Sequence, residues 1–485
     1  MTRLSHNEWS HHAMNSHCNI TVPAEIVDHI LSFLQSDPET LKTCSESHPS
    51  LCQLDEPYLY SHILFKTDDE SESEQCSKLT ELFSKRPYIV QYIRSLEIRV
   101  NSFHNTKVRR RRLEEISTIL PNLLALREIT LDHSPHSFGW NAQPESFRLA
   151  FLDCLRLQSM QDVHINSVVD FPFRSALDGE CKSIRSLTVR GGCSKPNQIN
   201  NLDLDSPITN QDLPLKSLCL HNCTESFFQG FAPWFATCRI QLRSLEFFSF
   251  LNWGYGSFPQ LLTGSSSSLT SLDLNLGLTQ SRTSFSTSII EYCIFIPFVG
   301  YYDFNIPPVV HDATESFFPV ILPTLPHLEQ LTIRATLHYI SDSWIMGRWG
   351  FYSPIPQITQ LISSNKPSLK RLILNLACTV RGNCLVQTKS LPWFSLSEVI
   401  CTPLVHLLSK TLAFERSGSS SIQVDLCLGG VLTGHLSNNL RTIPLNLIHS
   451  FLSGSKELMQ FVEQGRLLVT PPVPMSSNIN ILDCW

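Results

Sequence analysis

A phrase of three apolar residues, spaced as LxxLxL, recurs along this chain and constrains its fold more than any other feature. It occurs nine times, with central residues at positions 96, 129, 163, 187, 218, 245, 272, 331 and 372. Two apolar residues separated by one other residue suit a β-strand, because alternate side chains face the same side of a sheet. Helical patterns lie between several phrases, for example Phe147, Phe151 and Leu155 after Pro144. One strand and one helix cannot bury their apolar faces alone, so successive units must stack.

Most spacings between central residues are 24 to 34 residues, near or just above the period of about 20 to 29 residues that is typical of leucine-rich repeats. The stretch "LKSLCLHNC" ends at Cys223, where such a repeat carries Asn or Cys, and Gly192, Thr336 and Ala377 take equivalent positions. Small residues there predict a tight turn after each strand. The longest spacing, from 272 to 331, leaves open an insertion or one degenerate unit. We therefore predict an α/β fold with an irregular leucine-rich-repeat-like solenoid over residues 79–394.

The remaining segments divide the chain around this array, because its 485 residues exceed what one hydrophobic core normally organises. Residues 1–18 are polar and predict a flexible tail. The acidic run "TDDESESEQ" predicts a linker over residues 66–78. Residues 395–485 are predicted to cap the array, with a strand in "SIQVDLCLGG" and a helix in "SKELMQFVEQG" that starts at Ser455 and stops at Gly465.

Three short helices are predicted before the linker. Ile26, Ile30 and Leu34 form an apolar stripe on the first helix, which starts beside Pro23. Asp37 and Pro38 suit the N-cap and first turn of a second helix. A third short element is predicted near residues 51–54, followed by a strand at 63–65. So small a group of helices is expected to pack against something else.

The order Val22, Pro23, Glu25, Ile26, Ile30, Leu34, Leu41 and Cys44, followed by Tyr58, Leu59 and Tyr60, resembles an F-box. This resemblance implies a domain over residues 19–65 that binds the Skp adaptor, and through it the cullin scaffold, of SCF-type ubiquitin ligases. The positions that it marks for adaptor contact are Val22, Pro23, Ile26, Ile30, Leu34 and Leu41. Together with the degenerate repeats, the motif resembles the F-box-like proteins of mushroom-forming fungi.

The strand pattern also predicts a recognition face. If the leucines of each phrase point into the core, the residues between and after them point to the concave surface. This surface mixes both signs of charge with an aromatic side chain, as protein-binding surfaces do. The residues that we select as substrate-binding are Arg190, His221, Phe248, Asn275, Arg334 and Asn375.

Composition and motif searches exclude other function classes. A net charge of −6 disfavours binding to nucleic acid or to an anionic membrane, and the apolar run at 289–302 is shorter than the about 20 residues of a spanning helix. The searched phosphate-binding, hydrolase, zinc-protease and paired-cysteine motifs do not occur, so no catalytic residue and no cofactor is predicted. Cys219 and His221 share one strand face, but one strand supplies too few ligands, and no metal site is predicted.

The sixteen cysteines show no paired framework and no signal peptide precedes them, which predicts reduced thiols and a cytoplasmic location. The basic run "KVRRRR" at 107–112 leaves nuclear import open, against a solvated helix start.

Two functions follow. The first is a non-catalytic substrate receptor, which holds the adaptor with its helices and an unknown protein substrate with its concave face. The alternative is a leucine-rich-repeat scaffold or sensor without ligase association, whose first helices only cap the array.

Overall fold

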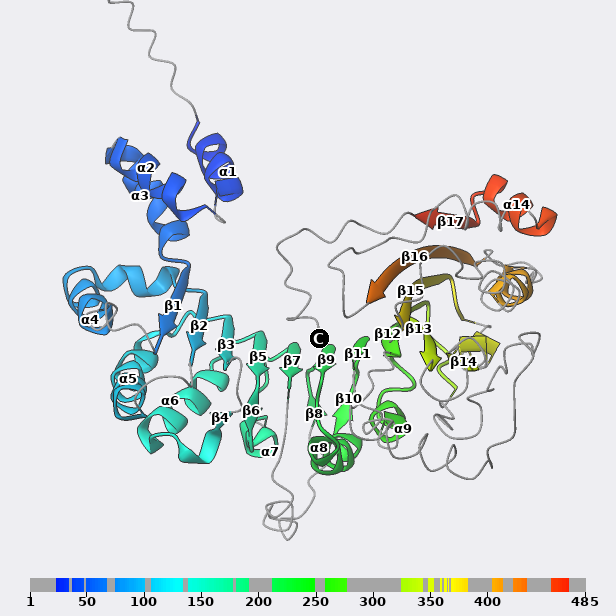
Figure 1. Ribbon diagram of the computed structural model, residues 1–485. Helices are drawn as coiled ribbons and strands as arrows, with labels where there is room; N and C mark the ends of the chain where they lie inside the picture. Colours follow the sequence, from blue (N-terminus) through cyan, green and yellow to red (C-terminus); the bar gives the residue numbers. More distant parts are fainter. Residues whose placement is uncertain are drawn as a thin grey trace, which may run out of the picture.

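The protein is a mixed α/β chain built on one long, open, mainly parallel sheet (Figure 1). The computed structural model describes residues 23–34, 37–47, 49–67, 75–100, 106–133, 138–177, 180–191, 212–248, 258–276, 324–342, 348–352, 358–359, 362–363, 365, 368–382, 404–412, 422–433 and 455–470. The predicted tail at 1–18 and the apolar run at 289–302 lie outside these residues.

Thirteen strands form the main sheet. In spatial order they are β1 (His62–Lys66), β2 (Ser95–Arg99), β3 (Glu128–Asp132), β5 (Asp162–Asn166), β7 (Ser186–Arg190), β9 (Ser217–His221), β11 (Ser244–Phe248), β12 (Ser271–Leu276), β13 (Gln330–Asp342), β15 (Arg371–Gly382), β16 (Gln423–Thr433) and β17 (Leu467–Thr470), with β14 (Arg348–Tyr352) antiparallel to β13. Two small pairs lie outside the main sheet: β4 (Phe138–Gly139) with β6 (Val168–Val169), and β8 (Asp212–Leu213) with β10 (Arg239–Ile240).

Helices α1 (Ala24–Leu34), α2 (Pro38–Ser47) and α3 (Pro49–Leu59) precede β1. Helices then connect strands of the sheet, as parallel pairing requires. Those with described bounds are α4 (Gln75–Lys85), α5 (Thr106–Ile119), α6 (Glu145–Leu155), α7 (Phe173–Ala176), α8 (Glu225–Thr237), α9 (Phe258–Thr263) and α14 (Lys456–Glu463), with short 3-10 turns η2 (Pro87–Tyr92), η3 (Leu120–Asn122) and η4 (Trp140–Ala142). Figure 1 shows the strands side by side along an arc, with α4 to α9 on its outer side.

The nine predicted phrases align in a single register across the sheet. The central residues of all nine pair in one ladder, from Leu96 through Leu218 to Leu372. Each is almost fully buried, on the side of the sheet that the helices cover. The sequence prediction of a parallel strand from each phrase is therefore confirmed, and the strand period of two assigns the intervening residues to the other, concave side.

The sheet extends past both boundaries that we predicted for the array. Strand β1, which we assigned to the helical domain over 19–65, pairs with β2. Strands β16 and β17, within the predicted cap at 395–485, continue the sheet beyond β15. Helix α4 also begins at Gln75, inside the predicted linker. The array thus includes three strands that lack the complete phrase.

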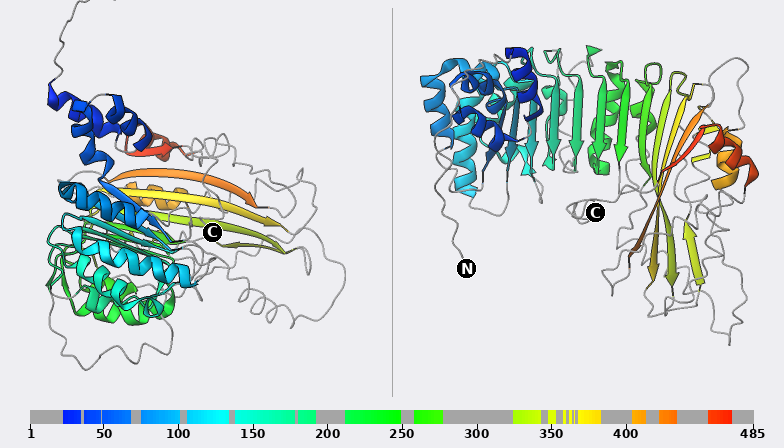
Figure 2. Two further views of the ribbon diagram at one scale, coloured as in Figure 1. Left: turned by 90° about the vertical axis from the view of Figure 1, so that its left-hand side faces the viewer. Right: turned by 90° about the horizontal axis from the view of Figure 1, so that it is seen from above.

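The long spacing between residues 272 and 331 is an insertion in the ladder. Strands β12 and β13 are hydrogen-bonded to each other directly, with Ser271 opposite Gln330, so no further strand lies between them. Strands β13, β15 and β16 are longer than the earlier ones, with 13, 12 and 11 residues. Figure 2 shows these later strands reaching beyond the ends of the earlier ones.

After β5, β7 and β9 the turn begins directly at the end of the strand, one residue before the position that the repeat predicts. Ser167, Gly191 and Asn222 follow β5, β7 and β9 directly, and all three have positive φ values of 56°, 59° and 53°. The predicted position falls one residue later, at Cys223, which is buried and donates its thiol toward the Val189 carbonyl. The predicted turns at Thr336 and Ala377 are wrong, because both residues lie inside the extended strands β13 and β15.

Several local predictions near the chain ends are confirmed. Asp37 caps α2 by accepting a hydrogen bond from the Thr40 backbone N–H at 3.1 Å. Ser455 caps α14, and Gly465 follows that helix with a φ of 67°. The helical pattern after Pro144 forms α6.

Candidate functional site

The first candidate surface is an exposed apolar face on α1. Ile26, Ile30 and Phe33 are 51%, 53% and 72% exposed. Their spacing places all three within about 60° of arc on the helix, because successive residues are about 100° apart. Most large apolar side chains that the structure describes are buried, so three exposed ones on one helix face form a surface that a partner can cover.

The opposite side of α1 holds the helix against its neighbours. Leu31 is 2% exposed. Tyr58 of α3 donates a hydrogen bond from its hydroxyl to Asp28 Oδ1 at 2.8 Å, and burial is the main cause that raises the pKa of this tyrosine. Helix α1 therefore has one side for its own fold and one side left for another molecule.

The six residues predicted to contact an adaptor divide between these two environments. Pro23, Ile26 and Ile30 are exposed, and Leu34 is half-buried. Leu41 is 1% exposed and belongs to the interior of the helical group. We therefore correct the prediction that Leu41 contacts the adaptor, because a side chain so deeply buried has no surface for a partner. Val22 lies outside the described residues. Sequence reasoning missed Phe33, although its spacing from Ile26 and Ile30 marks the same helix face.

The second candidate surface is a row of six side-chain positions on the concave side of the sheet. Consecutive strand pairings join all six predicted substrate-binding residues in one line: Arg190, His221, Phe248, Asn275, Arg334 and Asn375. Neighbouring strands lie about 4.8 Å apart, so the row spans about 24 Å. A length of this size fits an extended segment of a partner protein.

Most side chains in this row are accessible. Arg190 is exposed, whereas His221, Asn275, Arg334 and Asn375 are partly exposed. The position of Phe248 on β11 is described, but its side chain lies outside the description. The described side chains of the row therefore offer cationic, amide and imidazole groups from five strands.

A charge network lies beside the row at its centre. The Arg334 guanidinium lies 2.7 Å from Asp273 Oδ2 and 3.9 Å from Glu246 Oε1. Burial raises the pKa of Asp273, and the Arg334 charge opposes that rise. Arg334 thus has two carboxylates within reach, which fixes its side-chain direction more than it stabilises the fold.

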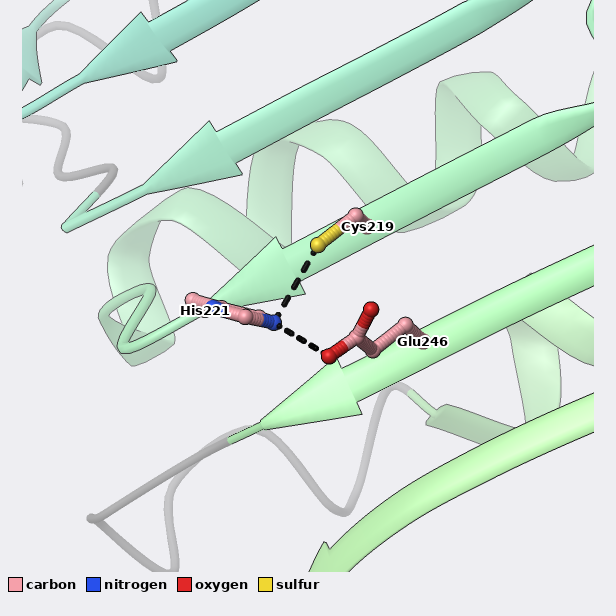
Figure 3. Close-up of side chains that lie close together, drawn as sticks. All are labelled: Cys219, His221 and Glu246. Carbon is pink, nitrogen blue, oxygen red and sulfur yellow. Dashed lines mark hydrogen bonds and ion pairs between the residues drawn. The ribbon is translucent and has the colours of Figure 1, made fainter. Parts of the chain in front are cut away.

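Cys219, His221 and Glu246 meet at this centre (Figure 3). Cys219 Sγ lies 3.1 Å from His221 Nε2, and the same nitrogen lies 3.0 Å from Glu246 Oε1. Cys219 and His221 are two residues apart on β9, and Glu246 on β11 is the strand partner of Cys219. All three are partly buried. Sequence reasoning noted the first two residues but missed Glu246, which the aligned phrases would have placed beside Cys219.

The thiol and the carboxylate of this cluster differ in protonation state at neutral pH. Burial, followed by the nearby Glu246 charge, raises the pKa of Cys219 to about 12. The hydrogen bond with His221 is the largest cause that lowers the pKa of Glu246. At neutral pH the thiol is therefore protonated and the carboxylate charged.

This arrangement differs from a thiol–imidazole–carboxylate catalytic triad. In such a triad one ring nitrogen contacts the nucleophile and the other contacts the carboxylate, and the thiol pKa is lowered. Here one nitrogen, Nε2, contacts both groups, and the thiol pKa is raised. The cluster instead brings three electron-pair donors of different kinds together.

The basic run at 107–112 lies in the first half of α5. Arg110 lies 3.2 Å from Glu114, while Arg111 and Arg112 each lie 2.9 Å from Glu115. These pairs are one helical turn apart and support the helix by a few tenths of a kcal/mol each. The arginines thus have a structural role within α5, and nuclear import stays an open prediction.

Comparison with known proteins adds no family to these observations. No protein-family model matches the sequence, and no curated protein matches it. Within the described parts of the chain, none of the helices is both long and apolar enough to cross a lipid bilayer. The cysteines that the structure describes form no disulfide bonds.

Proposed function

We propose that this protein is a non-catalytic substrate receptor of an SCF-type ubiquitin ligase. Helix α1 binds the Skp adaptor through Ile26, Ile30 and Phe33, and the adaptor joins the receptor to the cullin scaffold. The concave row from Arg190 to Asn375 binds the protein to be ubiquitinated. The receptor acts by raising the local concentration of that protein beside the ligase.

The exposed face of α1 carries this proposal. Helices that only capped the sheet would bury their apolar residues against it, whereas Leu31 is buried toward α2 and α3, outside the main core cluster. Ile26, Ile30 and Phe33 instead remain half exposed or more. An aromatic and two aliphatic side chains on one helix face are the anchors expected of a helix-mediated protein interface.

The fold supports the second half of the proposal. The sheet holds its exposed polar positions in a fixed register, so the row presents the same spacing to every partner segment. The charges are mixed in sign, as in protein-binding surfaces that use charge to select a partner. The strand ladder and the spacing of the phrases together support a leucine-rich-repeat-like architecture for this recognition face.

The test is co-purification of the full-length protein with its host's Skp adaptor and cullin. Ile26→Ala combined with Phe33→Ala should reduce recovery of both ligase subunits at least about tenfold, because interface anchors cost 2 kcal/mol or more when truncated. The matched control is Leu149→Ala on α6, whose side chain is 56% exposed. Recovery should not change in this control.

Two outcomes would contradict the proposal. If the unmodified chain recovers neither adaptor nor cullin, the receptor is refuted and the scaffold or sensor alternative remains. If the double variant recovers both subunits normally while its fold is intact by circular dichroism, the exposed face of α1 is not the docking surface.

A further inference from the structure

We infer that Cys219, His221 and Glu246 form a binding site for a transition-metal ion of the zinc class on the concave face. The sulfur, nitrogen and carboxylate oxygen that they offer all lie within 4.8 Å of one another. Such a mixed N, S and O ligand set is typical of zinc. The site is independent of the proposed ligase association, because it rests on the strands β9 and β11 alone.

The strands position the three ligands firmly. Cys219 and His221 point to the same side of β9, since residues two apart share a face. Glu246 is brought beside them by the strand register, opposite Cys219. Both strands are hydrogen-bonded on both sides, β9 to β7 and β11, and β11 to β9 and β12. Sites built on such elements hold their geometry better than sites on loops.

The distances need only a small adjustment. Tetrahedral zinc, with bonds of about 2.0 to 2.3 Å, places its ligand atoms about 3.3 to 3.7 Å apart. The observed separations are 3.1 Å from Cys219 Sγ to His221 Nε2 and 3.0 Å from Nε2 to Glu246 Oε1. Side-chain rotations that open these gaps by a few tenths of an ångström would admit the ion. The strand backbones need not move.

The lone pairs of Cys219 Sγ, His221 Nε2 and Glu246 Oε1 lie close together, and this arrangement favours a bound cation. Without metal, the Cys219 thiol and the His221 ring both hydrogen-bond to Glu246, so protons hold the three donor atoms together. A divalent ion can accept electron pairs from all three atoms at once. Three protein ligands leave a fourth position for water, which is the arrangement of open rather than closed zinc sites.

The surrounding charges are compatible with a divalent ion. At neutral pH without metal the Cys219 thiol keeps its proton, so Glu246 and the adjoining Asp273 contribute two negative charges. Arg334 and Arg190, which both act on the cluster electrostatically, contribute two positive charges. A divalent cation bound by the thiolate therefore changes the local net charge only from 0 to +1. Binding also releases the thiol proton, because the thiolate is the ligand.

The test uses the full-length chain, purified free of metal. The N-terminal tail carries His6, His11, His12, His17 and Cys18, which could bind metal themselves, so every measurement is made with these residues changed to Asn or Ser. Zinc is titrated against a chromophoric chelator, and cobalt(II) is titrated spectroscopically. We expect one equivalent of either ion, and a sulfur-to-cobalt charge-transfer band in the near ultraviolet.

Substitutions assign the ligands. Cys219→Ser and Glu246→Gln should each weaken zinc binding at least about 100-fold, since even supporting residues of metal sites cost 10- to 100-fold. His164→Asn is one control, because His164 lies 3.5 Å from Glu128 in a histidine–carboxylate pair on the same sheet. Cys427→Ser is the second, because Cys427 occupies the row of His221 on β16. Neither control should change zinc affinity.

Three results would overturn the site. They are the lack of stoichiometric binding, a cobalt complex without the thiolate band, and unchanged zinc affinity after Cys219→Ser. The cobalt band is measured on a chain with all three ligands in place, so it decides the matter even if a ligand variant misfolds.

Discussion

Two adjacent residues of α1 should respond oppositely to the same change. Ile30 is 53% exposed, whereas Leu31 is 2% exposed. If α1 is a docking helix, Ile30→Ala should spare the fold and weaken adaptor binding. Leu31→Ala should instead destabilise α1 itself. The pair therefore separates a docking surface from a capping helix within a single turn.

The magnitudes follow from burial. Leu31→Ala removes a fully buried side chain and should cost about 2 to 5 kcal/mol. Fully burying an isoleucine contributes about 1.5 to 3 kcal/mol, and Ile30 keeps half of its surface in water. Its truncation should therefore cost about 1 kcal/mol, less a few tenths because alanine has the higher helix propensity.

Local hydrogen exchange is the suitable assay, because a long array of stacked strands need not unfold in one step. A loss of 2 kcal/mol or more corresponds to about 30-fold faster exchange of protected amides in 24–34, since 1.4 kcal/mol is tenfold. Ile30→Ala should accelerate exchange no more than about fivefold. Equal acceleration by both variants would show that Ile30 is buried in solution and would refute the docking reasoning.

Three further results are expected. Asp55 is 0% exposed, neither carboxylate oxygen has a hydrogen-bond partner among the described residues, and burial raises its pKa. The contribution of Asp55 to the free energy of unfolding should therefore be most favourable below about pH 4 and should fall as pH rises through the folded-state pKa. Asp55→Asn should flatten this pH dependence, measured by urea titrations. Gly191→Ala should lower the free energy of unfolding by about 1 to 2 kcal/mol, because the φ of Gly191 is 59° and the new Cβ would lie 3.1 Å from Ser167 Oγ. Thermal melting measures this loss, and an unchanged melting temperature would contradict the left-handed turn. Arg190→Ala with Arg334→Ala should remove substrate proteins from affinity purifications while adaptor recovery persists; loss of both would indicate misfolding instead.

The sequence predicted the interior of the sheet better than its ends. Leucines spaced as LxxLxL mark a strand because they fill the space under the helices, and all nine phrases lie in one ladder. The three added strands lack part of this signal. Before Val424 and Leu467 the first apolar position of the phrase is occupied by Ser421 and Gln464. Before Ile63 this position is occupied by Tyr60, which we had assigned to the F-box-like motif.

The candidate sites show a second limit of sequence reasoning. On α1, the pattern identified apolar positions but not which of them the fold itself uses. Leu41 and Ile30 are alike in sequence, yet only the packing of α2 and α3 buries the first and leaves the second in water. Burial depends on neighbours from other elements, and local periodicity contains no information about them.

The metal cluster, in contrast, was accessible from the sequence. The aligned phrases set Leu218 opposite Leu245, and the same alignment sets Cys219 opposite Glu246. Considering β9 alone gave two ligands and excluded a metal, whereas considering two strands in register gives three. In a parallel array of known register, side chains that can act together lie at equivalent positions of neighbouring strands. Each exposed position should therefore be compared with its equivalents in the neighbouring phrases, because those residues, distant in sequence, are its nearest neighbours in space.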